Sequence, residues 1–523
     1  MDLVIMNALV VDGTGNPGFR GSVGVKGDKI AYVGALTPKA KKVIDARGAV
    51  VCPGFVDPHN HEELSLFRDG LLERYLRQGV TTGIDGNCGS SIMTTSKLTK
   101  KVQSVLGNPP PEASWNSLEE YKEAAESQGL GFNHGVMMGH GTMRWHAMGG
   151  AFRRQASPDE LDKMKRFLEE GLSQGAIGMS TGLDYVPGRA SDTAEIVELA
   201  KILAKYDRTY ASHVRNAVSF DRGDGVAEAL SIGRQSGARV HVSHLRPADK
   251  ASVTWIEEAR KRGVEAACDV MPQSGGHVHR IDAFTEETKN AFFEYYDMPV
   301  SEFRKVLLTP EGRKRVKENG QIASDKDEII LVHCKEEWWE GRSVSSVAGR
   351  LGVDPTDFVL DLMASEDIVT SIWMYCNRRN KSSIQRHPVY REVMSSPVVT
   401  CGSDSIMVDP KNPLIHYELQ RNGVFPAFLE MAGGLGSSLE YNIMRCTSLP
   451  ARMFRLSDRG LLAQGMAADL IIFDPLEFHF PEEIDPRDPG VVAKGVSHVV
   501  VNGKLVIEDF KLTSERPGRV LLK

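Results

Sequence analysis

The chain has 523 residues, of which 41% are hydrophobic and 25% charged, and its net charge is −6 with a pI near 6.2. This composition is ordinary for a globular enzyme, and the slight negative charge argues against nucleic acid or an anionic membrane as the main partner. The sequence opens without a basic, apolar leader, no segment approaches the roughly 18 apolar residues of a membrane helix, and the seven cysteines show no disulfide spacing. We therefore expect a cytoplasmic protein with reduced cysteines.

Both ends of the chain consist of short strand-like runs. Near the N-terminus they lie at 3–5, 8–11, 22–25 and 29–33, with a turn at Asp12-Gly13. Near the C-terminus they lie at 469–473 and 496–507, where Asn502-Gly503 predicts a tight hairpin. The two ends together predict one discontinuous β domain.

The middle of the chain alternates strand-like and helix-like segments, which predicts βα units with a parallel sheet or barrel. Helices are expected at 158–174, 193–206 and 251–262, and strands at 54–58, 79–84, 134–138, 176–180, 209–212, 239–243, 265–270 and 398–401. Eight such strands fit an α/β fold of the (β/α)8 TIM-barrel type. A charged insertion at about 275–345, with helices at 285–296 and 299–308, is expected between the seventh and eighth strands.

His59 and His61 follow the apolar run that contains the first of these strands. Side chains two residues apart on a strand point to the same face, so both imidazoles would serve one divalent metal. Taken alone, the pair is equally compatible with an ordinary polar loop.

Other strands end on residue types that bind metals. These residues are Cys88 after the second strand, His213 after the fifth, His244 after the sixth and Asp404 after the eighth. Alternation along the sixth strand places Val240, Val242 and His244 on one face and His241 on the other. Each residue has a structural alternative, such as a buried cysteine or a helix cap. Because the carboxyl ends of barrel strands face one mouth, we predict that all of them meet His59 and His61 there.

Several segments resemble the N-acyl-D-amino-acid deacylase (D-aminoacylase) branch of the amidohydrolase superfamily. They are 58–61, 87–89, 178–188, 212–216, 243–244 and 402–404, followed by 449–454, 458–460 and 467–470 in the tail. The resemblance covers essentially the whole chain. It implies a TIM-type barrel over residues 53–450 and a small β-sandwich formed by residues 1–52 and 451–523.

The same resemblance implies a zinc site. Cys88, His213 and His244 would hold one tightly bound Zn²⁺ and leave a fourth position open, as a catalytic site requires. His59, His61 and Asp404 would border or form a second, weaker site. Hydantoinase-like relatives use a bridging carboxylated lysine, but no lysine follows the fourth strand in 178–181, which favours the cysteine type of site.

The predicted activity is zinc-dependent hydrolysis of a C–N amide bond. A metal-activated water attacks the carbonyl carbon. Asp404 is the predicted general base, and it then acts as the acid that protonates the leaving nitrogen. The expected partner is a small-molecule amide, and the chain is compatible with a homo-oligomer.

The predicted substrate-binding residues depart from the family pattern. Arg246 stands where the family has lysine, Met271 and Gln273 replace two tyrosines, and Arg421 is displaced by one position. Two hypotheses are compatible with this pattern. Either Arg246, Arg421 and Tyr185 still bind a substrate carboxylate, or the substrate is an amide that has no carboxylate. A cyclic amide or imide hydrolase of the hydantoinase type is the alternative enzyme, and a non-catalytic protein on this fold is the third reading.

Overall fold

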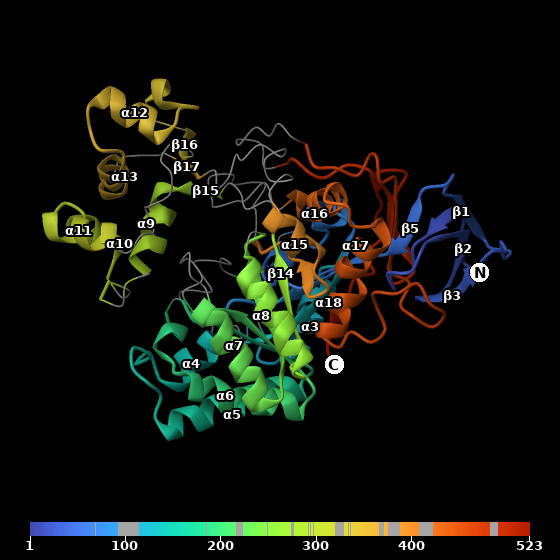
Figure 1. The fold of residues 1–523 in the computed structure, drawn as a ribbon, viewed down its shortest axis with the longest axis horizontal. Coiled ribbons are helices and arrows are strands. Elements are labelled where there is room, and N and C mark those ends of the chain that lie inside the picture. Colours follow the sequence, from blue (N-terminus) through green and yellow to red (C-terminus); the bar gives the residue numbers. More distant parts are fainter. Residues whose placement is uncertain are drawn as a thin grey trace.

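The computed structural model describes residues 1–67, 69–92, 115–184, 186–215, 223–247, 249–272, 277–290, 292, 294–295, 298–318, 329–332, 334, 336–365, 371–374, 388–406, 422–481 and 490–523. Strands near the N-terminus lie at one end of the long axis, and the helices of a segment inserted between β14 and β18 lie at the other (Figure 1). Parallel strands with their helices occupy the space between them.

Both chain ends contribute to one nine-stranded mixed sheet with the order β23-β22-β21-β20-β5-β1-β2-β3, and β4 pairs with β1. Its strands are β1 (Leu3–Val10), β2 (Phe19–Lys26), β3 (Lys29–Gly34), β4 (Lys42–Asp45), β5 (Val50–Pro53), β20 (Leu470–Phe473), β21 (Val496–Val501), β22 (Lys504–Glu508) and β23 (Lys511–Leu512). The strand predictions at both termini are confirmed. The two runs expected within 3–11 form a single strand, interrupted by an irregularity at Asn7, whose φ is 56°.

The predicted hairpin at Asn502-Gly503 joins β21 to β22. Asn502 has φ 45° and Gly503 has φ 80°, as a two-residue turn matching the strand twist requires. A Cβ at Gly503 would lie 1.9 Å from the carbonyl oxygen of Gly27, in the turn between β2 and β3. The turn near the C-terminus therefore packs directly against the turn between β2 and β3 near the N-terminus.

We expect Gly503→Ala to destabilise the protein by at least about 1–2 kcal/mol, because alanine adopts this left-handed conformation at a cost and also displaces Gly27. Denaturant unfolding should show a lower midpoint. Gly349→Ala is the control, since a Cβ at Gly349, in a helix, meets nothing within 4 Å. Equal midpoints for the two variants would contradict this account of the turn.

The middle of the chain forms two parallel sheets, with the orders β24-β9-β8-β6 and β10-β11-β12-β13-β14-β18, and β24 joins the first of them from the C-terminus. Their strands are β6 (Phe55–Asp57), β8 (Val80–Asp85), β9 (Asn133–Val136), β10 (Met138–Gly139), β11 (Gly178–Gly182), β12 (Thr209–His213), β13 (Arg239–Leu245), β14 (Ala266–Val270), β18 (Val399–Cys401) and β24 (Val520–Leu521). All eight strands predicted for this region are present. Met137 alone separates β9 from β10, so the sheets adjoin there. At their other edges, β19 (Ser405–Ile406) pairs in parallel with β7 (Asn60–His61).

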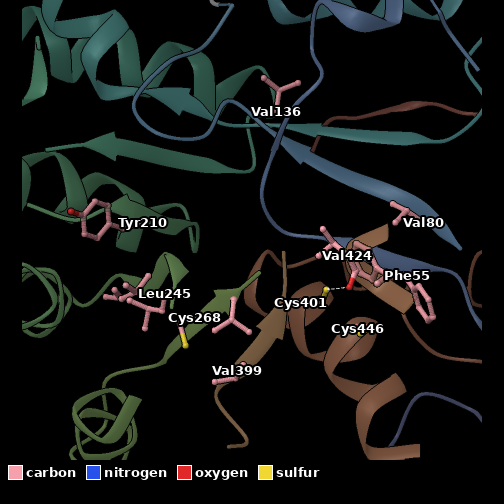
Figure 2. Packing of buried hydrophobic residues seen from close by; sticks show 14 of the residues in the cluster. Phe55, Val80, Val136, Tyr210, Leu245, Cys268, Val399, Cys401, Val424 and Cys446 are labelled. Carbon is pink, nitrogen blue, oxygen red and sulfur yellow. Dashed lines mark hydrogen bonds between the residues drawn. The ribbon is translucent and has the colours of Figure 1, made fainter. Parts of the chain in front are cut away.

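Alternation along these strands produces two layers of apolar side chains. One side of the strands packs against helices; Val240 and Val242 of β13 belong to this core. Figure 2 shows Phe55, Val424, Cys401 and Cys446 together in it, and the Cys401 thiol lies 3.8 Å from the Val424 carbonyl oxygen. The opposite side carries a second set of buried apolar residues, which pack on the Ala451–Leu456 segment and Leu521; they are Val56, Ile84, Met137, Ile177, Ala211 and Ala267.

The helices of this region include the three that were predicted. Pro158 and a capping box between Ser157 and Glu160 start α5, and Asp192 caps α6. The helical segments here are η1 (Ser65–Phe67), α1 (Glu73–Leu76), α3 (Leu118–Ser127), α4 (His140–Ala147), α5 (Pro158–Ser173), η3 (Gly188–Ala190), α6 (Thr193–Lys205), α7 (Gly223–Ser236), α8 (Lys250–Lys261), α15 (Pro388–Ser395), α16 (Val424–Gly434), α17 (Leu439–Cys446) and α18 (Ser448–Met453).

The segment between β14 and β18 has a hydrophobic core of its own, which runs from Ile281 to Met363. Its elements are β15 (His277–Arg280), α9 (Ile281–Asn290), α10 (Val300–Val306), α11 (Pro310–Glu318), β16 (Ile329–Val332), η4 (Glu337–Trp339), α12 (Val344–Leu351), α13 (Pro355–Ala364) and β17 (Ser371–Met374). The helix expected at 285–296 starts earlier, because the buried positions Ile281, Phe284, Thr285 and Thr288 follow a helical repeat from Ile281. Among the described helices, none is both long and apolar enough to cross a bilayer.

Candidate metal centre

Three imidazoles surround the thiol of Cys88. Its Sγ lies 3.4 Å from His59 Nε2, 3.8 Å from His213 Nδ1 and 3.7 Å from His244 Nε2. The ligand atoms of Cys88, His213 and His244 all lie within 4.8 Å of one another. A thiolate with two imidazoles is a donor set that suits Zn²⁺.

A second group of ligand atoms shares Cys88 and consists of His59, His61, Cys88 and Asp404. Asp404 Oδ1 lies 3.3 Å from His59 Nε2 and 3.4 Å from His61 Nε2. Both imidazoles are buried, whereas the Asp404 side chain is 16% exposed. The structure thus brings together all six residues proposed from the sequence, in two groups joined by the thiol, and Asp404 stands where solvent reaches them.

The sequence suggested that the apolar run before His59 is one strand, but the structure divides this run. It is divided into β5, β6 and β7, which pair with three different partners. A Cβ at Gly54, between β5 and β6, would lie 2.1 Å from Thr81 Oγ1, so the chain changes sheets where only glycine fits. His59 precedes β7, and both imidazoles still face Asp404.

Three of the six residues have a left-handed backbone. The φ angles are 52° at Cys88, 38° at His244 and 48° at Asp404. Residues other than glycine adopt this region at a cost, and such strain collects at functional sites, where the surroundings hold it in place. Cys88 and Asp404 lie in the turns that follow β8 and β18, and His244 lies near the end of β13, where its pairing with β14 is irregular.

The turn that carries Cys88 is anchored on the neighbouring strand β11. The amide of Gly89 donates to Ser180 Oγ at 2.9 Å, and the Ser180 hydroxyl donates to the Gly86 carbonyl at 2.5 Å. A Cβ at Gly86 would lie 2.4 Å from the Met137 carbonyl oxygen. Ser180 thereby clamps both ends of the turn and fixes the direction of the thiol.

His244 corrects a prediction drawn from strand alternation. His244 was expected on the same face as Val240 and Val242, opposite His241. The alternation ends at Val242, because the pairing of β13 with β14 shifts register between Val242 and Leu245. With its positive φ, His244 turns away from the helices, and its ring lies 4.9 Å from the ring of His59.

The segment that carries Asp404 is tied to the segment before His59. The Asp404 amide donates to the His59 carbonyl at 2.7 Å. The carboxylate of Asp57 accepts hydrogen bonds from the Ser403 amide at 3.0 Å and the Ser403 hydroxyl at 2.5 Å. These bonds involve the backbone amide of Asp404 and the neighbouring Ser403. The Asp404 carboxylate is not part of them and faces His59 and His61.

The centre is electrostatically suited to a cation. Burial acts to raise the pKa of Cys88, but the charge of His59 and hydrogen bonds with the three imidazoles outweigh it, and the pKa lies well below its usual value. Burial acts to lower the pKa of His61, but Asp404 and Cys88 raise it to about 9. Protons and a divalent cation therefore compete for the same side chains.

Of the proposed substrate-binding residues, the structure describes two. Arg246 follows β13 and Met271 follows β14, and both are partly exposed beside the strand ends that carry the site. Tyr185, Gln273 and Arg421 lie outside the described residues.

Sequence reasoning did not identify Asp57 and Asp269 as part of this centre. Each is a fully buried carboxylate inside an apolar strand, β6 or β14. Carboxylates are rarely buried without a partner. An aspartate inside an apolar strand was therefore the sequence feature that could have identified both residues.

Comparison with known proteins agrees with this geometry. The model of the amidohydrolase family (Amidohydro_3) matches residues 42–274 and 341–507, which is more than half of the chain. An N-acyl-D-glutamate deacylase from Alcaligenes xylosoxydans xylosoxydans is 30% identical over all of this chain and 96% of its own. A D-aminoacylase from the same organism is 29% identical over all of this chain and 98% of its own.

Solved structures resemble the chain over its full length. The crystal structure of N-acyl-D-glutamate deacylase from Bordetella bronchiseptica, complexed with zinc and a phosphonate inhibitor, has a TM-score of 0.76 at 26% identity, with both chains covered completely. An L-hydantoinase from Arthrobacter aurescens has a TM-score of 0.58 at 17% identity and shares the fold alone. The matches, the parallel sheets and the ligand groups agree: this chain belongs to the amidohydrolase family.

Proposed function

We propose that this protein is a zinc-dependent hydrolase of C–N amide bonds, related in activity to the N-acyl-D-amino-acid deacylases. The observation that carries the proposal is the convergence of Cys88, His213 and His244 next to His59, His61 and Asp404. A scaffold without catalysis would not require a buried thiol, four imidazoles and a carboxylate gathered in two groups that share the thiol, since burying such groups is costly.

Cys88, His213 and His244 would hold the tight zinc ion, and His59, His61 and Asp404 would form or border a weaker site. When bound, zinc supplies an acidified water and polarises the scissile carbonyl. The soft thiolate and the borderline imidazoles favour Zn²⁺ over Mg²⁺ or Ca²⁺, which prefer oxygen ligands.

Asp404 would move the proton. As the partly exposed carboxylate of the group, it lies where a substrate arrives, and His59 and His61 hold its Oδ1. It would take the proton of the attacking water and return it to the departing nitrogen, which cannot leave as an amide anion. The products are a carboxylic acid and an amine.

We further propose that the two parallel sheets close into a (β/α)8 barrel, supported by the pairing of β19 with β7 and the hydrogen bond from Asp404 to His59. Residues 53–450 would form it, and 1–52 with 451–523 a β-sandwich. The return of β24 to β9 would tie the last residues to the barrel.

For the substrate, we infer that recognition of a carboxylate is weakened. Arg246 stays at the mouth, but Met271 places a thioether where the deacylase pattern has tyrosine. A site built to bind a polar group rejects an analogue without it by about 10⁴-fold or more, and an eroded one discriminates much less.

A matched substrate pair tests this function. We expect the zinc-loaded protein to hydrolyse an N-acetyl-D-amino acid and its carboxamide with kcat/KM values within about 10²-fold of each other. Hydantoins and lactams in the same panel separate the cyclic amide hydrolase from the linear one. A preference above 10⁴ for the free acid would overturn the inference about the carboxylate, and no hydrolysis of any amide would overturn the function.

A further inference from the structure

The carboxylate of Asp269 lies at the centre of the site and belongs to neither ligand group. It sits on β14 and is completely buried. Its Oδ2 accepts a hydrogen bond from the His244 amide at 2.9 Å. Its Oδ1 lies 3.6 Å from His59 Nδ1. One carboxylate therefore contacts two ligand residues from different sheets: His244 on β13, and His59 between β6 and β7.

The position of this carboxylate is fixed from a third side by His241, whose Nε2 lies 2.8 Å from Asp269 Oδ1. The His241 ring is fully buried and packs 5.2 Å from the Phe454 ring, below the site. Asp269 already accepts a hydrogen bond from the His244 amide through Oδ2, and a carboxylate offers only acceptors, so His241 Nε2 donates in the bond to Oδ1.

The neighbouring strand leaves room for the carboxylate. A Cβ at Gly402, just before Asp404, would lie 2.5 Å from Asp269 Oδ2. The absence of a side chain at Gly402 lets Asp269 approach the segment that carries Asp404.

We propose that Asp269 is a positioning residue for metal binding: it holds the Nδ1–H tautomer of His59, so that Nε2 faces Cys88 and Asp404 as a ligand, and it holds the strained backbone of His244. The inference rests on the function proposed above. A carboxylate behind a metal-ligating imidazole fixes the ring and increases its basicity, and removing such a partner costs about 10–100-fold in metal affinity.

Asp269→Asn separates positioning from packing, because it keeps the shape of the side chain. The amide oxygen can still accept from the His244 amide, but the NH₂ group would then point towards His59 Nδ1 and His241 Nε2. A donor facing Nδ1 favours the tautomer with its proton on Nε2, which blocks the ligand nitrogen. We expect 10–100-fold weaker zinc binding, measured with the full chain by competition with a chelator.

The matched control is Glu195→Gln. Glu195 is also a buried acid that pairs with a histidine, through His140 Nε2 at 2.7 Å, and it has no hydrogen bond to the six ligand residues. We expect this control to lower the thermal midpoint of the metal-free protein without changing zinc affinity. Cobalt(II) serves as a spectroscopic probe: the thiolate-to-cobalt band should keep its intensity at saturation in Asp269→Asn but require more metal.

Wild-type zinc affinity in a folded Asp269→Asn protein would overturn the inference. If that variant does not fold, His241→Phe is the second test, because it removes one hydrogen bond from the Asp269 carboxylate. We expect weaker zinc binding in this variant, and unchanged zinc affinity would also overturn the inference. A wild-type protein that binds no zinc would instead overturn the proposed function, so the two failures are distinct.

Discussion

Asp404→Asn is expected to lower kcat for amide hydrolysis by about 10²–10⁴-fold while the tight zinc ion stays bound. The asparagine cannot take up a proton, whereas the backbone hydrogen bond from residue 404 to His59 does not involve the side chain. The tight group, Cys88 with His213 and His244, does not include Asp404. The effect should therefore fall on kcat more than on metal content.

The measurement is kcat and KM at a fixed zinc occupancy, with the metal content of the same sample determined by atomic absorption. The acidic limb of the pH–rate profile, which reports protonation of the base, should also disappear. Near wild-type kcat would show that another group moves the proton. Loss of the tight zinc together with activity would show that Asp404 acts mainly as a ligand.

Cys88→Ala should abolish tight zinc binding and, with it, turnover. The thiol is shared by both ligand groups, so its removal affects every proposed metal position at once. The charge of His59 and hydrogen bonds with the imidazoles hold the pKa of Cys88 well below its usual value, which favours the thiolate, the form that binds metals. We expect a dialysed sample to hold little zinc, and added zinc to raise the thermal midpoint of the wild type but not of the variant.

Cys52→Ala is the control for this result. Cys52 is also buried but lies in β5 of the terminal sheet. Its replacement should cost packing energy of the usual size for a small core truncation and leave zinc content unchanged. Retention of one tight zinc ion by Cys88→Ala would disprove the thiolate as a ligand.

The order of the strands was predictable because local patterns carry it. The eight strands of the middle region have apolar runs bounded by turn residues, and the hairpin at Asn502-Gly503 needs positive φ at both positions. The six ligand-type residues were found for a related reason: each follows the carboxyl end of a strand, and parallel strands bring those ends together.

Alternation failed where the pairing is irregular. His244 is two residues after Val242, so regular alternation would place both on the same face of β13. The register shift before Leu245 turns His244 to the other face. The division of residues 50–61 into three strands was likewise invisible, because the apolar character is continuous while the strand partners change at Gly54. Both events depend on neighbouring strands, which a local pattern does not contain.

Residue type and spacing are enough to predict parallel βα units with a thiol, imidazoles and a carboxylate at the ends of the strands. Three features emerge from the folded chain alone: Cys88 is shared by both ligand groups, three of the six residues have a left-handed backbone, and Asp269 lies behind two of them. They could not be predicted because distances of 3–4 Å between side chains on different strands depend on register, turns and close packing at positions such as Gly402 and Gly86.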